Sequence, residues 1–114
     1  MHIYKILRDA EWRQLEADGV SSGAPVDVAD GFVHFSTAGQ AGETLARHFA
    51  GETGLWLIAC DAELLGPALR WEPSRGGALF PHLYRPLRRT DVLHAGPLER
   101  DADGGLVLPL EDEA

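Results

Sequence analysis

The sequence lacks paired cysteines, long apolar runs and a secretory signal, which are the marks of disulfide-rich, membrane and secreted proteins. Cys60 is the only cysteine among 114 residues, so an internal disulfide and a paired-thiol metal site are both excluded. No stretch approaches the length of a membrane span, and the N-terminus becomes charged within a few residues, unlike a secretory signal. These absences predict a cytoplasmic protein with no membrane partner.

Motifs of several common catalytic sites are also missing. The five histidines include no pair at i and i+4 and no HExxH pattern, so a metal site is not predicted. The sequence has no Walker-type loop and no GxGxxG, and neither Ser36 nor Ser74 lies in a GxSxG nucleophile elbow. The usual nucleotide-binding frameworks and the serine hydrolases are therefore not favoured.

Positive charge is scarce except in one segment. The net charge is -8, but residues 70–89 carry five arginines against Glu72 alone. An acidic protein with one short basic segment does not suit a nucleic acid, which requires many phosphates to be neutralised over an extended face. The segment could bind one small anion, or its arginines could form a solvated face that pairs with the acidic remainder.

Hydrophobic patterning predicts five strands and a hairpin. These stretches alternate in polarity or are rich in β-branched and aromatic residues. The run LWLIAC is apolar throughout, so its strand is expected to be buried on both faces, with Cys60 packed as a small apolar side chain. The predicted strands are residues 2–7, 32–35, 55–60, 68–73 and 80–84, and a hairpin about DADGG spans 91–110.

Two helices are predicted in the N-terminal half. Asp9 can cap the first helix, and Gly19 suits the left-handed turn that ends it. Thr37 and Gln40 fit a capping box for the second helix. Residues 20–30 contain Ser, Gly, Pro and Asp in the proportions of a loop, so an irregular segment is expected there.

These elements predict one α+β domain. Helices early in the chain and strands later favour a mixed or antiparallel sheet, and the regular alternation of a doubly wound fold is absent after residue 61. The chain has the length of one domain with one core. We expect that domain to span residues 1–110 and the acidic tail, residues 111–114, to be frayed.

The stretch GFVHFST, residues 31–37, is a first candidate wall of a site. A strand that ends near His34 and leads into Ser36 and Thr37 at a helix start offers hydroxyls and backbone N–H groups to an anion. The alternative is that Thr37 only caps the helix and His34 only fills the core.

Two later stretches, WEPSRGG and FPHLY, are the second candidate wall. Arg75 could bind a carboxylate or phosphate and Trp71 could stack on a planar ring, or Arg75 and Glu72 could pair within a simple turn. His82 and Tyr84 fall on the same side of an extended strand, where they could line a site or form a half-buried aromatic face.

The blocks GFVHFSTAGQ, LRWEPSRGG and LFPHLYRPL, in this order, resemble the small bacterial family known as domain of unknown function 952. The resemblance extends from the IYKIL strand to the terminal hairpin. It implies a fold placed with the ADP-ribosyltransferases, which cleave NAD at the nicotinamide ribose. NAD or a related nucleotide is then the implied ligand, although a likeness of fold carries little functional weight by itself.

The transferase motifs are matched only in part. Tyr4 and Lys5 resemble the first motif without its His, and GFVHFSTA resembles the second, with His34 near the stacking aromatic residue. The third motif places Pro81 and His82 where the transferases have their catalytic Glu. A histidine cannot stabilise an oxocarbenium-like transition state as a carboxylate does, so transfer of ADP-ribose is not expected unless a neighbouring carboxylate replaces it.

Two hypotheses follow, and the sequence leaves the ligand, the reaction and the oligomeric state open. The first is a pocket for a small anionic or nucleotide-like ligand, with or without weak catalysis, and the second is a non-enzymatic interaction module. An enzyme would require the polar side chains to converge in one open pocket, with Glu72 and His34 neither on opposite faces nor wholly buried. In the first hypothesis the catalytic residues are Glu72, His82 and His34, and the ligand-binding residues are Ser36, Thr37, Trp71, Arg75 and Tyr84.

Overall fold

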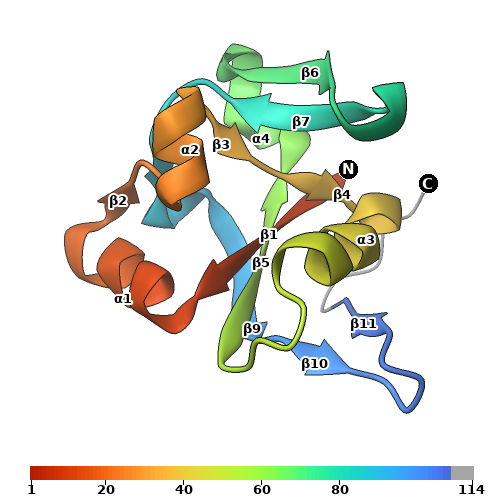
Figure 1. Ribbon diagram of the computed structural model, residues 1–114. Coiled ribbons are helices and arrows are strands. Elements are labelled where there is room, and N and C mark those ends of the chain that lie inside the picture. The colour runs from red at the N-terminus through yellow and green to blue at the C-terminus, as the bar shows by residue number, and fades with distance from the viewer. Residues whose placement is uncertain (109–114) are drawn as a thin grey trace.

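The fold is built around a long antiparallel pair between the first strand and a strand from the middle of the chain. In this computed structural model, which describes residues 1–108, β1 (His2–Arg8) pairs along its whole length with β5 (Leu55–Asp61). β4 (Ser36–Thr37) pairs with the other edge of β1, and β9 (Val92–Pro97) pairs with β5. The order of this sheet is β4-β1-β5-β9, and Figure 1 shows β1 and β5 crossing the centre of the molecule. The prediction that LWLIAC forms an interior strand is confirmed.

Three smaller sheets complete the strand pairing, and every pairing is antiparallel. The largest has the order β3-β7-β6. A two-stranded sheet joins β2 to β8, and the predicted C-terminal hairpin is present as β10 and β11. The bounds are β2 (Val20–Ser21), β3 (Val33–His34), β6 (Leu69–Pro73), β7 (Leu79–Leu83), β8 (Leu87–Arg88), β10 (Glu99–Arg100) and β11 (Leu106–Val107).

The chain passes from the three-stranded sheet to the four-stranded sheet at Phe35. The residue lies between β3 and β4, and its N–H donates to the Pro81 carbonyl at 3.0 Å, a last bond to the smaller sheet. The next residue, Ser36, already pairs with Tyr4 of β1. His34 and Ser36 therefore belong to different sheets although only one residue separates them.

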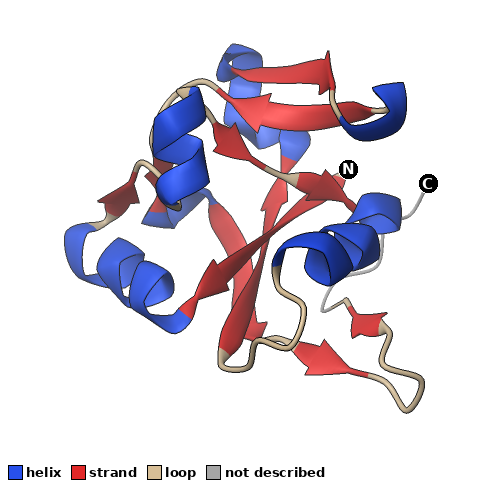
Figure 2. Cartoon of the chain, viewed as in Figure 1, coloured by secondary structure: helices blue, strands red, loops and turns tan. Residues whose placement is uncertain are grey.

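Four α-helices lie among residues 1–108, and Figure 2 shows how they surround the sheets. The two predicted helices are present as α1 and α3, and Gly19 ends α1 in the left-handed conformation, as expected. The N-cap residue of α1 is Arg8 and not Asp9 as predicted. The N–H of Arg8 donates a hydrogen bond to the Glu11 carboxylate at 2.8 Å. The helices are α1 (Asp9–Asp18), α2 (Pro25–Asp30), α3 (Ala38–His48) and α4 (Ala62–Leu65), with single 3-10 turns η1 (Gly66–Ala68), η2 (Arg75–Gly77) and η3 (Arg89–Asp91).

The prediction of an irregular segment at residues 20–30 is wrong. The segment contains β2 and α2, so the N-terminal half has three helices instead of two. Pro25 occupies the first turn of α2, where its missing N–H is not needed, and Gly31 ends the helix with φ of 84°. A helix of six residues is too short to display the spacing by which longer helices are recognised in a sequence.

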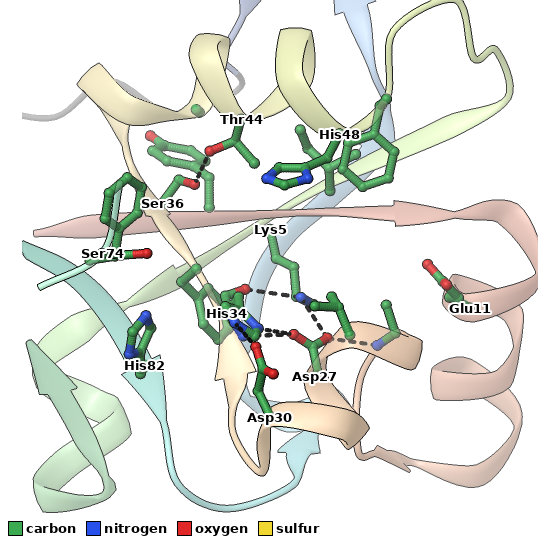
Figure 3. A pocket seen from close by; sticks show the side chains of 18 of the residues that line it. Lys5, Glu11, Asp27, Asp30, His34, Ser36, Thr44, His48, Ser74 and His82 are labelled. Atoms are coloured by element: carbon green, nitrogen blue, oxygen red, sulfur yellow. Dashed lines mark hydrogen bonds and ion pairs between the residues drawn. The ribbon is translucent and has the colours of Figure 1, made fainter. Parts of the chain in front are cut away.

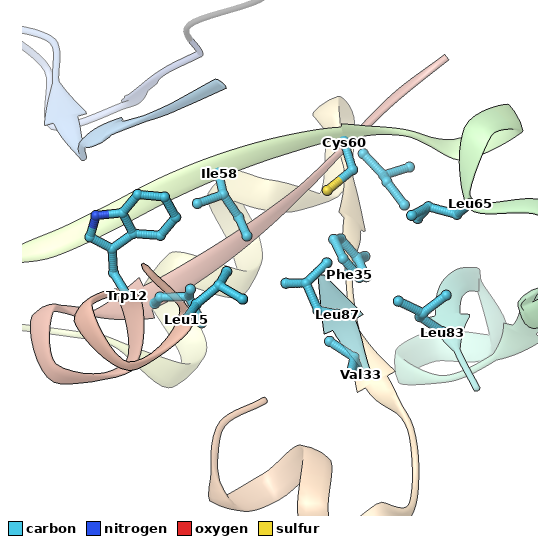
Figure 4. Packing of buried hydrophobic residues seen from close by; sticks show 11 residues of the cluster. Trp12, Leu15, Val33, Phe35, Ile58, Cys60, Leu65, Leu83 and Leu87 are labelled. Carbon is cyan, nitrogen blue, oxygen red and sulfur yellow. The ribbon is translucent and has the colours of Figure 1, made fainter. Parts of the chain in front are cut away.

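Alternation along β1 directs its side chains to two apolar clusters. Ile3 and Leu7 pack with Trp12 and Leu15 of α1 and with residues of β3, β5 and β8, the cluster drawn in Figure 4. The side chains of opposite parity, Tyr4 and Ile6, belong to a second cluster that includes Ala41, Leu45 and Phe49 of α3 together with Leu55, Leu57 and Ala59 of β5. The central sheet is thus covered on both faces.

The structure is a single α+β domain with antiparallel sheets. Of the predicted domain, residues 109 and 110 lie outside the described part of the chain, as does the predicted tail at 111–114. Within residues 1–108 no helix is long and apolar enough to cross a membrane.

We predict that Leu15→Ala lowers the free energy of unfolding by about 2–5 kcal/mol, because it leaves a cavity in the cluster beneath α1. Leu15 is fully buried, whereas Leu64 in α4 is 73% exposed. Leu64→Ala therefore serves as a matched control and should change the free energy by no more than about 0.5 kcal/mol. Urea denaturation followed by circular dichroism measures both, and equal effects would contradict this packing.

Candidate functional site

A cavity of about 780 Å³ opens where the two larger sheets meet. Figure 3 shows β1 running across it, with α3 on one side and α2 on the other. Both sheets contribute: Ser36 belongs to β4 of the four-stranded sheet, and His34 and His82 belong to the three-stranded sheet. The lining residues are Tyr4, Lys5, Ile6, Arg8, Glu11, Ala24, Pro25, Val26, Asp27, Asp30, His34, Phe35, Ser36, Ala41, Thr44, His48, Phe49, Ser74, Phe80 and His82.

Lys5 places a positive charge in the wall of this cavity. The alternation of β1 puts it on the same side as Ile3 and Leu7, and its side chain is only 6% exposed. The ammonium donates to the His34 carbonyl at 2.9 Å and to the Asp27 carboxylate at 2.9 Å. An unpaired ammonium at this depth would be strongly destabilising, so the partner on α2 is required by the position of Lys5.

Asp27 is the most heavily bonded carboxylate of the site. Its Oδ2 accepts from the Ala24 N–H at 2.6 Å and from Lys5, and its Oδ1 accepts from the His34 N–H at 2.9 Å. Oδ1 also lies 2.6 Å from Nδ1 of the His34 ring. Burial opposes ionisation of Asp27, but the hydrogen bonds from His34 and the charge of Lys5 outweigh it and lower the pKa of Asp27 to about 2.

The His34 ring lies between two carboxylates of α2. Nδ1 faces Asp27, and Nε2 is 3.0 Å from Oδ2 of Asp30, which is half exposed. Each ring nitrogen of His34 therefore faces a carboxylate oxygen, which is an acceptor for a proton on that nitrogen.

The His82 ring has a carboxylate partner of its own, Glu72. Nδ1 lies 2.9 Å from Oε1 of Glu72, and the same oxygen accepts the Tyr84 hydroxyl at 2.5 Å. The bond from Tyr84, followed by that from His82, lowers the pKa of Glu72, and the bond to Glu72 raises the pKa of Tyr84. Phe32 completes the group, because its ring stacks on His82 with centroids 4.1 Å apart and also contacts Tyr84 and His34.

Strand register explains which predicted residues come together. His34 pairs with His82 across β3 and β7, and Glu72 on β6 pairs with Phe80 on β7, two residues from His82. Since side chains alternate between faces, His34, His82 and Glu72 share one face of the three-stranded sheet. Neither Glu72 nor His34 is wholly buried, their side chains being 35% and 32% exposed.

Other predicted residues lie beside the cavity or away from it. Trp71 pairs with Pro81 and points to the opposite face of the sheet, so it is not brought to the cavity. Glu72 and Tyr84 do not line the cavity, but Glu72 contacts the ring of His82, which does, and accepts the hydroxyl of Tyr84. Ser36 lines the cavity and its hydroxyl lies 2.8 Å from that of Thr44. Thr37 is the N-cap residue of α3, and its N–H donates to the Gln40 side chain at 3.0 Å. Arg75 opens the turn η2.

The strongest residues of the site that sequence reasoning missed are Asp27, Asp30 and Phe32. Asp27 and Asp30 are three residues apart in VDVAD, a spacing that places two carboxylates on one side of a helix once the helix is recognised. Phe32 lies in the predicted strand and directly precedes the observed β3, but its contacts with His82 and Tyr84 depend on residues 50 and 52 positions later in the chain. The sequence offers a signal for the first two residues and none for Phe32.

Three arginines of the basic segment have partners outside the cavity. Arg85 forms two hydrogen bonds to Asp91, at 2.8 and 3.1 Å. Arg89 lies over the Trp12 ring at 5.0 Å, and Arg70 lies over the Tyr84 ring at 4.8 Å. These contacts favour the structural interpretation of the segment for the three arginines concerned.

Other chemistries find little support among the described residues. Cys60 is fully buried, and burial raises the pKa of its thiol to about 12, so it packs as an apolar residue, as predicted. The sequence Gly19-Val20-Ser21-Ser22-Gly23 has the form GxSxG, but Ser21 lies in β2 and not at a turn between strand and helix. Within residues 1–108, no three His, Cys, Asp or Glu side chains are grouped so that they could hold a metal ion.

We predict that Asp27→Asn lowers the free energy of unfolding by about 3–5 kcal/mol, because Lys5 is left buried without a counter-charge. Asp30→Asn is the matched control on the same helix. Its carboxylate is 47% exposed, so its loss should cost no more than about 1 kcal/mol. Chemical denaturation at neutral pH measures both variants, and similar losses would contradict the central role of Asp27.

The depressed pKa of Asp27 also predicts a specific pH dependence of stability. Its folded pKa of about 2 lies below the ordinary value of 3.8, so its stabilising contribution is complete above pH 4 and is lost as the pH falls toward 2. The contribution corresponds to about 2 kcal/mol. Unfolding measured between pH 5 and pH 2 should show this loss in the wild-type chain and not in Asp27→Asn, and parallel curves would contradict it.

Comparisons with known proteins identify the family and supply no activity. The family model described as "Protein of unknown function (DUF952)" matches residues 6–95. The crystal structure of protein CC0527 from Caulobacter crescentus is 51% identical over 94% of each chain, with a TM-score of 0.86. Its solution NMR structure is 53% identical over 91% of this chain and 90% of that one, with a TM-score of 0.79. No curated protein matches. The resemblance to this family is thereby confirmed over residues 6–95, and the chain belongs to the family of proteins of unknown function DUF952.

Proposed function

We propose that the protein binds a small anionic, nucleotide-like molecule in the cavity between α2 and α3. The observation that carries this proposal is the ammonium of Lys5 in the cavity wall. The two acceptors found for it among the described residues, Asp27 and the His34 carbonyl, use two of its three N–H donors. A third donor on a desolvated cation is a strong partner for a phosphate or carboxylate oxygen.

The size and lining of the cavity support the same ligand class. Its volume lies within the range of about 300–1,000 Å³ that is typical of small-molecule sites. Tyr4, Phe49 and Phe80 offer apolar surface for a planar ring, and Ser36 and Thr44 offer hydroxyl groups. A molecule with a ring and an anionic group would satisfy both parts of this lining.

The ADP-ribosyltransferase-like fold, and with it NAD, remains part of the proposal. Lys5 and His34, which lie in the stretches that resemble in part the first two transferase motifs, line the same cavity. His82 lines it where the transferases have a carboxylate, and Glu72 lies behind that histidine. We therefore expect binding of a nucleotide without transfer of ADP-ribose.

Nicotinamide, AMP, ADP-ribose and inorganic phosphate are the probes that test this function. We predict that at least one phosphate-bearing probe shifts the backbone amide signals of Lys5, His34, Ser36 and Thr44 in a titration followed by NMR. The same probe should raise the melting temperature with the logarithm of its concentration. Amide signals of β10, which contributes no residue to the cavity lining, should not move.

Lys5→Met should weaken binding of that probe by about tenfold or more, since it removes the charged donor and keeps an unbranched side chain. Arg47→Met is the matched control, because Arg47 is an exposed cation of α3 that pairs with Glu43 and does not line the cavity. The affinity of Arg75→Ala for the same probe tests whether Arg75, which the sequence favoured as a ligand-binding residue, contributes to binding. Binding by none of the probes, or equal binding by Lys5→Met, would reject the function and leave the non-enzymatic interaction module.

A further inference from the structure

The two histidines of the cavity are direct neighbours with different hydrogen-bond partners. They are register partners on β3 and β7, their rings meet edge to face with centroids 5.4 Å apart, and both line the cavity. His34 has a carboxylate at each ring nitrogen, Asp27 at Nδ1 and Asp30 at Nε2. For His82, Glu72 at Nδ1 is the one hydrogen-bond partner found among the side chains that the structure describes.

This difference assigns different roles to the two rings. His34 has an acceptor oxygen at both ring nitrogens, so its partners do not select one of them for the proton. His82 has a carboxylate at Nδ1 alone, and this partner suits a ring whose proton is on Nδ1. The side chain of His82 is 6% exposed, so its Nε2 lone pair lies largely out of contact with bulk water.

We infer that Glu72 is a positioning residue, which holds His82 in the Nδ1–H form so that Nε2 accepts a hydrogen bond from a hydroxyl group of the bound molecule. The inference rests on the proposed function and narrows its ligand class to hydroxyl-bearing phosphates. The mixed charge of the cavity suits such molecules, because Lys5 offers a donor to the phosphate while the carboxylates of Asp30 and Glu11 offer acceptors to further hydroxyls.

The first test needs no ligand. Long-range proton–nitrogen NMR spectra of the imidazoles at pH 7 should show His82 with its proton on Nδ1 and a bare Nε2. Glu72→Gln should reduce this form. A carboxylate can only accept a hydrogen bond from Nδ1–H, whereas the Gln amide can also donate to an unprotonated Nδ1. Glu99→Gln is the matched control, because Glu99 is an exposed residue of β10. A proton on Nε2 in the wild-type chain, or a spectrum unchanged by Glu72→Gln, would overturn the inference.

The second test compares two phosphates of equal carbon number, glycerol 3-phosphate with two hydroxyls and propyl phosphate with none. NMR titration should give a dissociation constant about tenfold lower for glycerol 3-phosphate, the effect of one buried hydrogen bond. His82→Phe, which keeps a planar ring without an acceptor, should remove this preference and still bind propyl phosphate. Equal binding of the two phosphates by the wild-type chain would overturn the inference and leave the proposed function standing. If neither phosphate binds, the inference is likewise overturned, and the proposed function is then decided by the titrations with AMP, ADP-ribose and inorganic phosphate.

Discussion

The buried ion pair between Lys5 and Asp27 is the interaction on which the site depends. Strand alternation directs Lys5 to the same side as Ile3 and Leu7, where an ammonium cannot remain without a counter-charge. Asp27 supplies that charge and also binds two backbone N–H groups and the His34 ring. One carboxylate therefore joins β1, β3 and α2, three elements that belong to different parts of the chain.

The same interaction explains the local sequence around α2. A side chain at Gly23 would place its Cβ 2.2 Å from Oδ2 of Asp27, and the φ of Gly23 is 95°, which only glycine adopts easily. The loop before α2 thus passes close to the carboxylate because the residue there has no side chain. Held in this way, α2 also presents Asp30 to His34, so the position of one buried carboxylate sets the surroundings of the histidine.

The sequence predicted most of the fold and only part of the site, for physical reasons that differ. Elements whose signals come from residues adjacent in the sequence were predicted correctly. They are the interior strand LWLIAC, the helix that begins after Thr37 and the DADGG hairpin. Helix α2 was missed because six residues give no periodic pattern. The pairing of His34 with His82 joins residues 48 positions apart, and no local pattern encodes such a register.

Glu72 shows how a residue that the sequence singled out acquires a different meaning in the structure. A carboxylate that replaced the transferase glutamate would have to leave its present position and enter the cavity. One of its oxygens accepts from both His82 and Tyr84, and the loss of a partner costs a buried donor about 1–3 kcal/mol. The His82 ring, with its side chain only 6% exposed, would bear most of this cost, whereas the Tyr84 hydroxyl can turn to water. Glu72 is therefore more stable as the partner of His82 than as a group in the cavity.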